Sequence, residues 1–209
     1  MTSETRTKRK YELKKRADEM AQTRRRITEA AIGLHGTVGP ARTTLSAVAK
    51  RAGVQRHTVY RHFPTDADLF AACSAHYFAA NPWPDLESWR TIADPRQRLA
   101  RALDELYAYY ERTEPMFSNV LRDLELVDNL QPTIVPLQDY LADAAQILAT
   151  GWPARGRRRH LLAAAVRHAV NFQTWRSLAA DNSITRTEAV QLATALVLAA
   201  TAAPRRASG

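Results

Sequence analysis

One cysteine, Cys73, occurs among the 209 residues of this sequence, so no disulfide can form within the chain. A lone thiol is typical of a reducing compartment. Cys73 and His76 are three residues apart, a spacing that two metal ligands on one helix could share. No further Cys/His cluster accompanies the pair, so ordinary packing of both side chains is favoured over a metal site. We expect neither a metal nor a cofactor.

Long apolar runs are missing as well. A membrane-spanning helix needs about 20 apolar residues, whereas the alanine-rich C-terminal segment is interrupted by Gln191 and Thr194. The N-terminus carries charge with no apolar segment behind it, which does not fit a secretory signal. The sequence therefore predicts a cytoplasmic protein with no membrane partner.

Acidic residues are scarce in the first third of the chain. Residues 1–63 hold 15 Lys/Arg against 5 Asp/Glu, a net charge of +10, whereas residues 64–209 hold 15 against 16, a net charge of −1. Cationic side chains displace the counterions condensed on phosphates, so a polyanionic partner explains this asymmetry. An acidic membrane surface would also attract the charge, but the basic segment lacks the bulky apolar face of interfacial helices. Nucleic acid is the favoured partner.

Signals for catalysis and for β-strands are also lacking. The sequence contains no nucleophile elbow, phosphate loop or metal-ligand motif, and its Asp and Glu residues are scattered over the predicted helix faces. No segment alternates convincingly between apolar and polar residues with a period of two. We therefore predict an all-α protein that is not an enzyme.

Residues 44–63, TLSAVAKRAGVQRHTVYRHF, form the most informative segment. Apolar residues recur there at helical spacing behind Thr44, which is placed as an N-cap. Gly53 follows where a helix ends in a left-handed residue, a conformation that glycine adopts without strain. In the next short helix, Val59 and Phe63 lie one turn apart and face inward, which leaves a polar, basic outer face. This pattern is typical of a DNA-binding helix-turn-helix, although a packed helical hairpin shows the same apolar periodicity.

The run GVQRHTVYRHF, followed by Pro64, Thr65, Asp66 and Leu69, resembles the DNA-binding signature of the TetR/AcrR family of transcriptional repressors. The resemblance covers about residues 24–72. Members of this family often carry a lysine where Asp66 stands, and that lysine contacts a phosphate. An aspartate cannot do so, and the chain must find this contact elsewhere or lack it. At the start of a helix, Asp66 instead suits the macrodipole.

The resemblance implies an N-terminal three-helix bundle with the helix-turn-helix, followed by a C-terminal helical domain for ligand binding and dimerisation. We expect a basic arm or helix extension over residues 1–22, the DNA-binding domain over 23–68, the regulatory domain over 69–203 and a flexible tail over 204–209. In the regulatory domain the sequence pattern predicts helices over about 95–113, 115–124, 133–149, 156–180 and 189–202.

The helix-turn-helix and its second helix supply the candidate DNA contacts. Phosphate contacts position such a module without reading sequence, and we assign them to Thr44, Tyr60 and His62. Arginine can pair bidentately with guanine, and glutamine can read adenine. The candidates for base edges are Gln55, Arg56, His57, Thr58 and Arg61.

A basic stretch precedes this domain. Beside a DNA-reading helix, such an arm can follow the backbone or enter an adjacent minor groove. A solvated tail is an equally good interpretation of the same charges. The residues concerned are Lys8, Arg9, Lys10, Lys14 and Lys15.

The last two predicted helices combine small and apolar side chains. The resemblance implies that they pair with those of a second copy in a homodimer, and the small residues permit close approach. The alternative is that they only complete the core of one chain. The apolar candidates for the dimer interface are Leu162, Val166, Leu192, Leu196 and Val197.

Most aromatic side chains belong to the middle helices, where relatives enclose an effector pocket. Such pockets are mainly apolar with a few polar groups, which suggests a small apolar or aromatic effector without a dominant charged site. Ordinary core packing is the alternative for any one of these side chains. The candidates are Trp89, Tyr107, Tyr110, Phe117, Tyr140, His168, Asn171, Phe172 and Trp175.

The resemblance implies a sequence-specific DNA-binding transcriptional regulator. We expect a repressor that binds a palindromic operator as a dimer and is released by the effector. A non-specific architectural DNA-binding protein would share the basic charge, and an activator or ligand-independent regulator would share every feature above.

Overall fold

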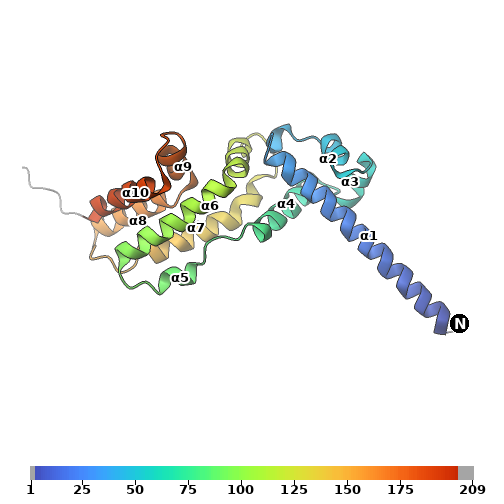
Figure 1. Cartoon of the computed structure of the whole chain (residues 1–209), viewed down its shortest axis with the longest axis horizontal. Coiled ribbons are helices and arrows are strands. Elements are labelled where there is room, and N and C mark those ends of the chain that lie inside the picture. Colours follow the sequence, from blue (N-terminus) through green and yellow to red (C-terminus); the bar gives the residue numbers. More distant parts are fainter. Residues whose placement is uncertain (1–2, 202–209) are drawn as a thin grey trace, which may run out of the picture. The chain divides into compact units, whose positions relative to one another are not determined.

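The computed structural model describes residues 3–201, with side chains from Lys10 onward. Every regular element in these residues is helical, which confirms the predicted all-α fold. The first elements are α1 (Ser3–His35), the 3-10 helix η1 (Pro40–Arg42), α2 (Leu45–Ala52), α3 (Arg56–His62) and α4 (Asp66–Ala80). They are followed by α5 (Leu86–Arg90), α6 (Pro95–Asp123), η2 (Gln131–Ile134), α7 (Val135–Leu148), α8 (Arg157–Ala169), α9 (Phe172–Trp175), the π-helical η3 (Arg176–Ala180) and α10 (Arg186–Thr201) (Figure 1). The predicted tail, residues 204–209, lies outside the described residues.

The chain divides into two compact units. The N-terminal unit takes in residues 1–80 and 118–133, and the C-terminal unit takes in residues 81–117 and 134–209. The predicted boundary after residue 68 therefore differs from the structure, because α4 belongs wholly to the N-terminal unit. Leu69 and Cys73 of α4 are buried in the same apolar core as α1. No described helix is long and apolar enough to cross a membrane.

The core of the N-terminal unit is built from α1, α2, α3 and α4. Ile27 and Ala31 of α1 are fully buried there, together with Val48 of α2 and Val59 of α3. Burial of each larger aliphatic side chain contributes about 1.5–3 kcal/mol. Cys73 packs into this core, and burial raises the pKa of its thiol to about 12.

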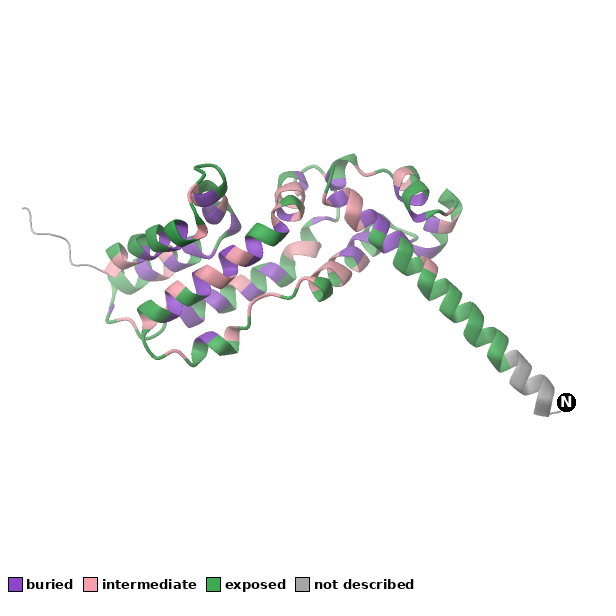
Figure 2. Cartoon of the chain, in the orientation of Figure 1, coloured by how far each residue is buried: buried purple, intermediate pink, exposed green. Residues whose placement is uncertain are grey.

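Helix α1 includes the stretch for which we predicted a basic arm or a helix extension. Its periodic apolar face begins only after Thr23, yet the helix starts at Ser3. All side chains from Lys10 to Gln22 are exposed, as Figure 2 shows along this half of the helix. This part of α1 has no core to pack against, so its helical form rests on local propensity rather than on burial.

The end of α6 is anchored in the N-terminal unit. The buried carboxylate of Asp123 accepts a hydrogen bond from the Ala41 N–H at 3.0 Å, and Asn119 Nδ2 donates to the His35 carbonyl at 3.0 Å. Gly39 lies between them with φ 91°, and a Cβ there would overlap the Arg122 guanidinium and the Asp123 carboxylate. Glycine is therefore required by both the backbone conformation and the close approach.

Helix α6 continues through Pro115, so the predicted break between residues 113 and 115 is wrong. Proline removes one backbone N–H and disfavours a helix interior by about 3 kcal/mol. Aromatic packing on both sides offsets this cost, because the rings of Tyr110 and Phe117 are 6.0 Å apart in one buried cluster. The Thr113 hydroxyl also donates to the Tyr109 carbonyl at 2.8 Å.

The helix predicted over residues 156–180 is interrupted after Ala169. Two buried tyrosines cause the interruption: the Tyr107 hydroxyl donates to the Ala169 carbonyl at 3.0 Å, and the Tyr110 hydroxyl donates to the Val170 carbonyl at 2.6 Å. The Asn171 side chain then accepts from the Gln173 N–H at 2.8 Å and begins a new helix. These contacts come from a distant part of the chain, so local pattern could not reveal the break.

Candidate nucleic-acid interface

Helices α2 and α3 form the predicted helix-turn-helix. The Thr44 side chain accepts a hydrogen bond from the Ala47 N–H at 3.1 Å and so caps α2. Gly53 ends the helix in the left-handed conformation, with φ 65° and ψ 39°. Both local predictions are confirmed, and the turn directs the chain into α3 without strain.

Helix α3 has one buried face and one exposed polar face. Val59 is fully buried, and Phe63 directly after the helix is also buried. The opposite face groups cationic and hydrogen-bonding side chains, and the Arg56 Nη2 donates to the Tyr60 hydroxyl at 2.9 Å. The exposed side chains are Gln55, Arg56, His57, Tyr60 and Arg61, with Thr58 half-buried beside them. The predicted base-reading residues are thus brought together on one surface.

His62 does not share this exposed face. Its residue is only 8% exposed, and its ring Nε2 has no hydrogen-bond partner among the described residues. Burial lowers the pKa of the imidazole, and the positive charges of Arg61 and Arg24 lower it further. The ring is therefore withdrawn from the exposed face, which corrects the prediction that His62 contacts a phosphate.

Arg24 of α1 is a residue that the sequence did not single out. Its guanidinium carbon lies 4.0 Å from the centroid of the Phe63 ring, and Nη1 donates to the His62 carbonyl. The last carbonyls of a helix lack partners within the helix, and a cation is favoured beside them. Arg24 therefore positions the end of α3, a role that requires the tertiary contact between α1 and α3.

The start of α4 is a reciprocal cap. Asp68 Oδ2 accepts from the Thr65 N–H at 3.1 Å and from the Thr65 hydroxyl at 2.7 Å, while Thr65 Oγ1 accepts from the Asp68 N–H at 3.1 Å. Asp66 is exposed in the first turn. The two carboxylates suit this helix end electrostatically, and neither offers the cation that a phosphate needs.

The basic arm is only partly described. Lys10, Lys14 and Lys15 lie exposed on the first half of α1. Lys8 and Arg9 belong to the same helix, but their side chains lie outside the described residues. The arm is thus helical where the backbone is described, and the choice between a DNA contact and a solvated segment stays a prediction.

Most of the aromatic residues predicted to line a pocket pack against one another in the C-terminal unit. The Tyr110 ring lies 5.4 Å from Phe172 and 6.0 Å from Trp175, and the Phe117 ring lies 5.3 Å from Phe172. Trp89 Nε1 donates to Glu105 at 2.7 Å. The buried aromatic members are Trp89, Tyr107, Tyr110, Phe117, Tyr140, Phe172 and Trp175. In this conformation they form part of the hydrophobic core of the C-terminal unit.

The two polar members of that prediction are exposed. Asn171 is used as the cap of α9, and His168 Nδ1 lies 3.4 Å from the Thr174 hydroxyl. Neither is enclosed with the aromatic rings.

The predicted interface residues fall into two groups. Leu162, Val166 and Val197 are at most 1% exposed, because α8 and α10 already pack against each other within the chain. Leu192 and Leu196 are 44% and 52% exposed on α10. Only the second group is free to contact another chain, and Leu161 of α8 is a further exposed leucine.

Comparison with known proteins agrees with this geometry. Residues 27–73 match bacterial regulatory proteins, tetR family. The HTH-type transcriptional regulator AcrR of Shigella flexneri is 38% identical over 58 residues, which cover 28% of this chain and 27% of that relative. The match therefore spans about a quarter of the curated relative's length.

Solved structures resemble the chain over a greater length. A TetR-like transcriptional regulator from Rhodococcus sp. RHA1 has a TM-score of 0.59 at 19% identity, over 84% of this chain and 93% of that one. FadR from Bacillus subtilis, solved in complex with stearoyl-CoA, has a TM-score of 0.56 at 18% identity. The likeness covers 85% of this chain and 97% of that one. At such identities the likeness shows the fold. Residues 27–73 therefore form a helix-turn-helix domain that matches bacterial regulatory proteins of the tetR family.

Proposed function

We propose that this protein is a sequence-specific transcriptional regulator, a repressor that binds a palindromic operator as a homodimer. The observation that carries the proposal is the polar face of α3. Arg56, His57 and Arg61 are exposed there, on the side opposite the buried Val59. A helix of this kind fits the major groove, where arginine can pair with guanine edges. We place the protein in the cytoplasm, where it meets DNA, and we assign it no enzymatic role.

Dimerisation is part of the proposal because a palindrome has two half-sites. Two recognition helices must lie about one turn of DNA apart, and a two-fold axis supplies that spacing. The exposed Leu192 and Leu196 of α10 offer apolar area for such an interface. These two leucines are one turn apart and share one face of the helix, so they form a small apolar patch that a partner could cover.

Release by a small-molecule effector completes the proposal. An effector that prefers a conformation with poorly spaced recognition helices must weaken DNA binding by the same coupling free energy. FadR, with a similar fold, was solved with stearoyl-CoA, which supports ligand responsiveness. In this chain α6 contributes residues to both units, and its last residues hold the His35 carbonyl and the Ala41 N–H. A shift of α6 would therefore directly displace the end of α1.

The deciding experiment compares DNA fragments over a series of salt concentrations. Purified protein is titrated against its own upstream DNA and against random DNA of equal length. We expect a palindromic site bound about a thousandfold more tightly than random DNA. Equal affinity for both, falling steeply with salt, would instead identify an architectural DNA-binding protein.

A second measurement separates a repressor from an activator or a ligand-independent regulator. A reporter gene under the upstream DNA should be silenced by the protein and restored by the effector. A rise in reporter expression on adding the protein would contradict the repressor assignment while leaving sequence-specific binding intact.

A further inference from the structure

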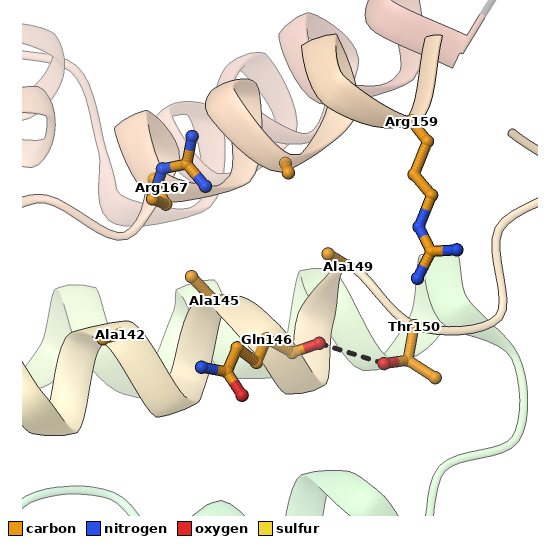
Figure 3. Close-up of a pocket in the computed structure, with 8 residues that line it drawn as sticks. Ala142, Ala145, Gln146, Ala149, Thr150, Arg159 and Arg167 are labelled. Carbon is orange, nitrogen blue, oxygen red and sulfur yellow. Dashed lines mark hydrogen bonds between the residues drawn. The ribbon is translucent and has the colours of Figure 1, made fainter. Parts of the chain in front are cut away.

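A cavity of about 490 Å³ lies between α7 and α8 in the C-terminal unit. It contains none of the aromatic residues that the sequence suggested for a pocket. Its lining residues are Ala142, Ala145, Gln146, Ala149 and Thr150 from the α7 side and Arg159, Ala163 and Arg167 from α8 (Figure 3). Its size is within the usual range for small-molecule sites, about 300–1,000 Å³.

Alanines make up the floor of this cavity. Ala142 and Ala145 of α7 and its C-cap Ala149 recur at helical spacing, and Ala163 of α8 lines the cavity with them. Residues three and four apart share a helix face. Small side chains on both helices leave room between them, and together they offer an apolar strip that an apolar body could cover.

Two arginines mark the ends of the strip. Arg159 and Arg167 are eight residues apart on α8, which places their Cα atoms about 12 Å apart along the helix axis. Neither forms an ion pair or a hydrogen bond with any residue that the structure describes, and no lining residue is acidic. Figure 3 shows Arg159 extending from α8 toward Thr150, with Arg167 at the other end beside Ala142 and Ala145.

Local helix energetics do not account for the positive charge at the start of α8. Arg157, Arg158 and Arg159 occupy the first turn of α8, which contains no acidic residue. The helix macrodipole disfavours cations at that end by several tenths of a kcal/mol each, roughly. Residues that oppose local preference are expected where a function requires them. An anion bound between the arginines would reverse the unfavourable electrostatics.

We propose that the α7–α8 cavity binds an elongated organic anion, with carboxylate or phosphate groups at its ends and an apolar body over the alanines. Arg159 and Arg167 hold the two charged ends, since guanidinium groups match carboxylate and phosphate oxygens bidentately. Gln146 also lines the cavity, from the α7 side, and its amide is a neutral donor. The proposal that the cavity binds an anion does not depend on the proposed function. The further step that this anion is the effector rests on the proposed function.

The test uses naphthalene-2,6-dicarboxylate as the probe and full-length protein without DNA. Isothermal titration calorimetry compares the dicarboxylate with 2,6-bis(hydroxymethyl)naphthalene, which has the same body without charge. Arg159→Gln and Arg167→Gln each remove one cationic end. Arg158→Gln is the matched control, because Arg158 is exposed on the same helix and does not line the cavity. Ala163→Leu fills the cavity without changing charge.

We expect saturable binding of the dicarboxylate, at least about tenfold tighter than that of the diol. Each of Arg159→Gln and Arg167→Gln should raise the Kd about tenfold, and Arg158→Gln should leave it unchanged. Ala163→Leu should abolish binding, with circular dichroism verifying its fold; if it fails to fold, the arginine variants decide. A naphthalene with phosphate groups at the same two positions shows which anion the site prefers. Tighter binding of either anion than of the diol supports the site.

No saturable binding of either anion would overturn the inference. So would equal losses in all three arginine variants, which would indicate attraction to the general charge of α8. Operator affinity is measured on the same preparations without the probe. Operator binding that persists while the anions fail to bind refutes the cavity alone, whereas anion binding without operator preference refutes the proposed function alone.

Discussion

The guanidinium carbon of Arg24 lies 4.0 Å from the centroid of the Phe63 ring, and its Nη1 donates to the His62 carbonyl. One side chain of α1 thereby contacts both the last residue of α3 and the residue after it. The recognition helix is seven residues long, too short to be stable by itself in water. Its orientation therefore depends on contacts such as this one.

Replacing Arg24 with methionine should loosen the end of α3. The change removes a cation–π contact and a hydrogen bond to a carbonyl, together about 1–2 kcal/mol at a partly exposed site. Hydrogen exchange of the α3 amides should show protection reduced by about one order of magnitude. Arg25→Met is the control, because Arg25 makes only an exposed pair with Glu29 at 2.7 Å. Unchanged protection in Arg24→Met would contradict the positioning role.

Arg61→Ala should relax sequence preference. Arg61 is exposed on the polar face of α3, and removing a bidentate pair with guanine costs about 1–3 kcal/mol. Operator affinity should fall by that amount, while affinity for random DNA falls much less. Both are measured by fluorescence anisotropy at one salt concentration. Equal losses on the two DNAs would show that Arg61 contacts phosphate instead.

Acid should destabilise the N-terminal unit through His35. Burial lowers the pKa of this imidazole from 6.5 to about 4, although Asp123 opposes the shift. The unfolded chain takes up this proton below pH 6.5 and the folded chain does not, so the stability present above pH 6.5 is lost as the pH falls toward 4. Between pH 7 and pH 5 the loss is about 2 kcal/mol.

The His35→Phe variant tests this pH dependence. Phenylalanine should retain contact with Phe70, whose ring centroid lies 5.6 Å from that of His35. Protection factors of the core amides of α1, measured at pH 7 and pH 5, should then lose most of their pH dependence. His57→Phe, at an exposed position, serves as the control. A pH dependence as steep in His35→Phe as in the parent protein would assign the effect to another group.

The exposed lysines of α1 should determine part of the salt dependence of DNA binding. Substituting Lys10, Lys14 and Lys15 with glutamine should flatten the slope of log K against log salt by about 0.9 for each phosphate that these lysines neutralise. The charge-preserving Lys→Arg triple variant should keep the slope. A slope unchanged in the glutamine variant would identify this half of α1 as a solvated helix.

Leu196→Glu should dissociate the proposed dimer. A carboxylate at a buried apolar interface costs several kcal/mol when unpaired, whereas in a monomer this 52% exposed position tolerates it. Light scattering after size-exclusion chromatography gives the mass directly. Leu126→Glu is the matched control at a 71% exposed leucine outside α10. A variant that keeps the parent mass would move the interface away from α10.

Local signals predicted the helix-turn-helix well. The cap at Thr44, the left-handed Gly53 and the inward-facing Val59 each depend on residues within about one turn, so the sequence contains the whole cause. The start of α10 has a similar local cause, because the Thr185 N–H donates to Glu188 at 2.8 Å in a capping box. Interactions of this range depend only on neighbouring residues, so they can be predicted from the sequence.

Predictions failed where a distant segment intervened. Pro115 predicts a helix end, yet α6 continues through it, and Tyr110 and Phe117 on either side of it pack against the distant Phe172. The alanine-rich run after Gly156 predicts one helix. The hydroxyls of Tyr107 and Tyr110 instead donate hydrogen bonds to two carbonyls in the middle of this run, where the helix is interrupted. His62 follows the polar pattern of α3, yet its ring is buried. Each of these contacts joins residues far apart in sequence or depends on which side of a helix is covered.

The sequence by itself determined the helical class, the DNA-binding segment and the concentration of positive charge in residues 1–63, because periodicity, capping and charge are properties of neighbouring residues. Tertiary structure alone decided that Arg24 holds the end of α3, that the aromatic residues close into a core, and that Arg159 and Arg167 line a cavity between α7 and α8. The physical reason is that burial and side-chain pairing depend on which surfaces meet. That choice is made by the packing of whole helices rather than by any one stretch of residues.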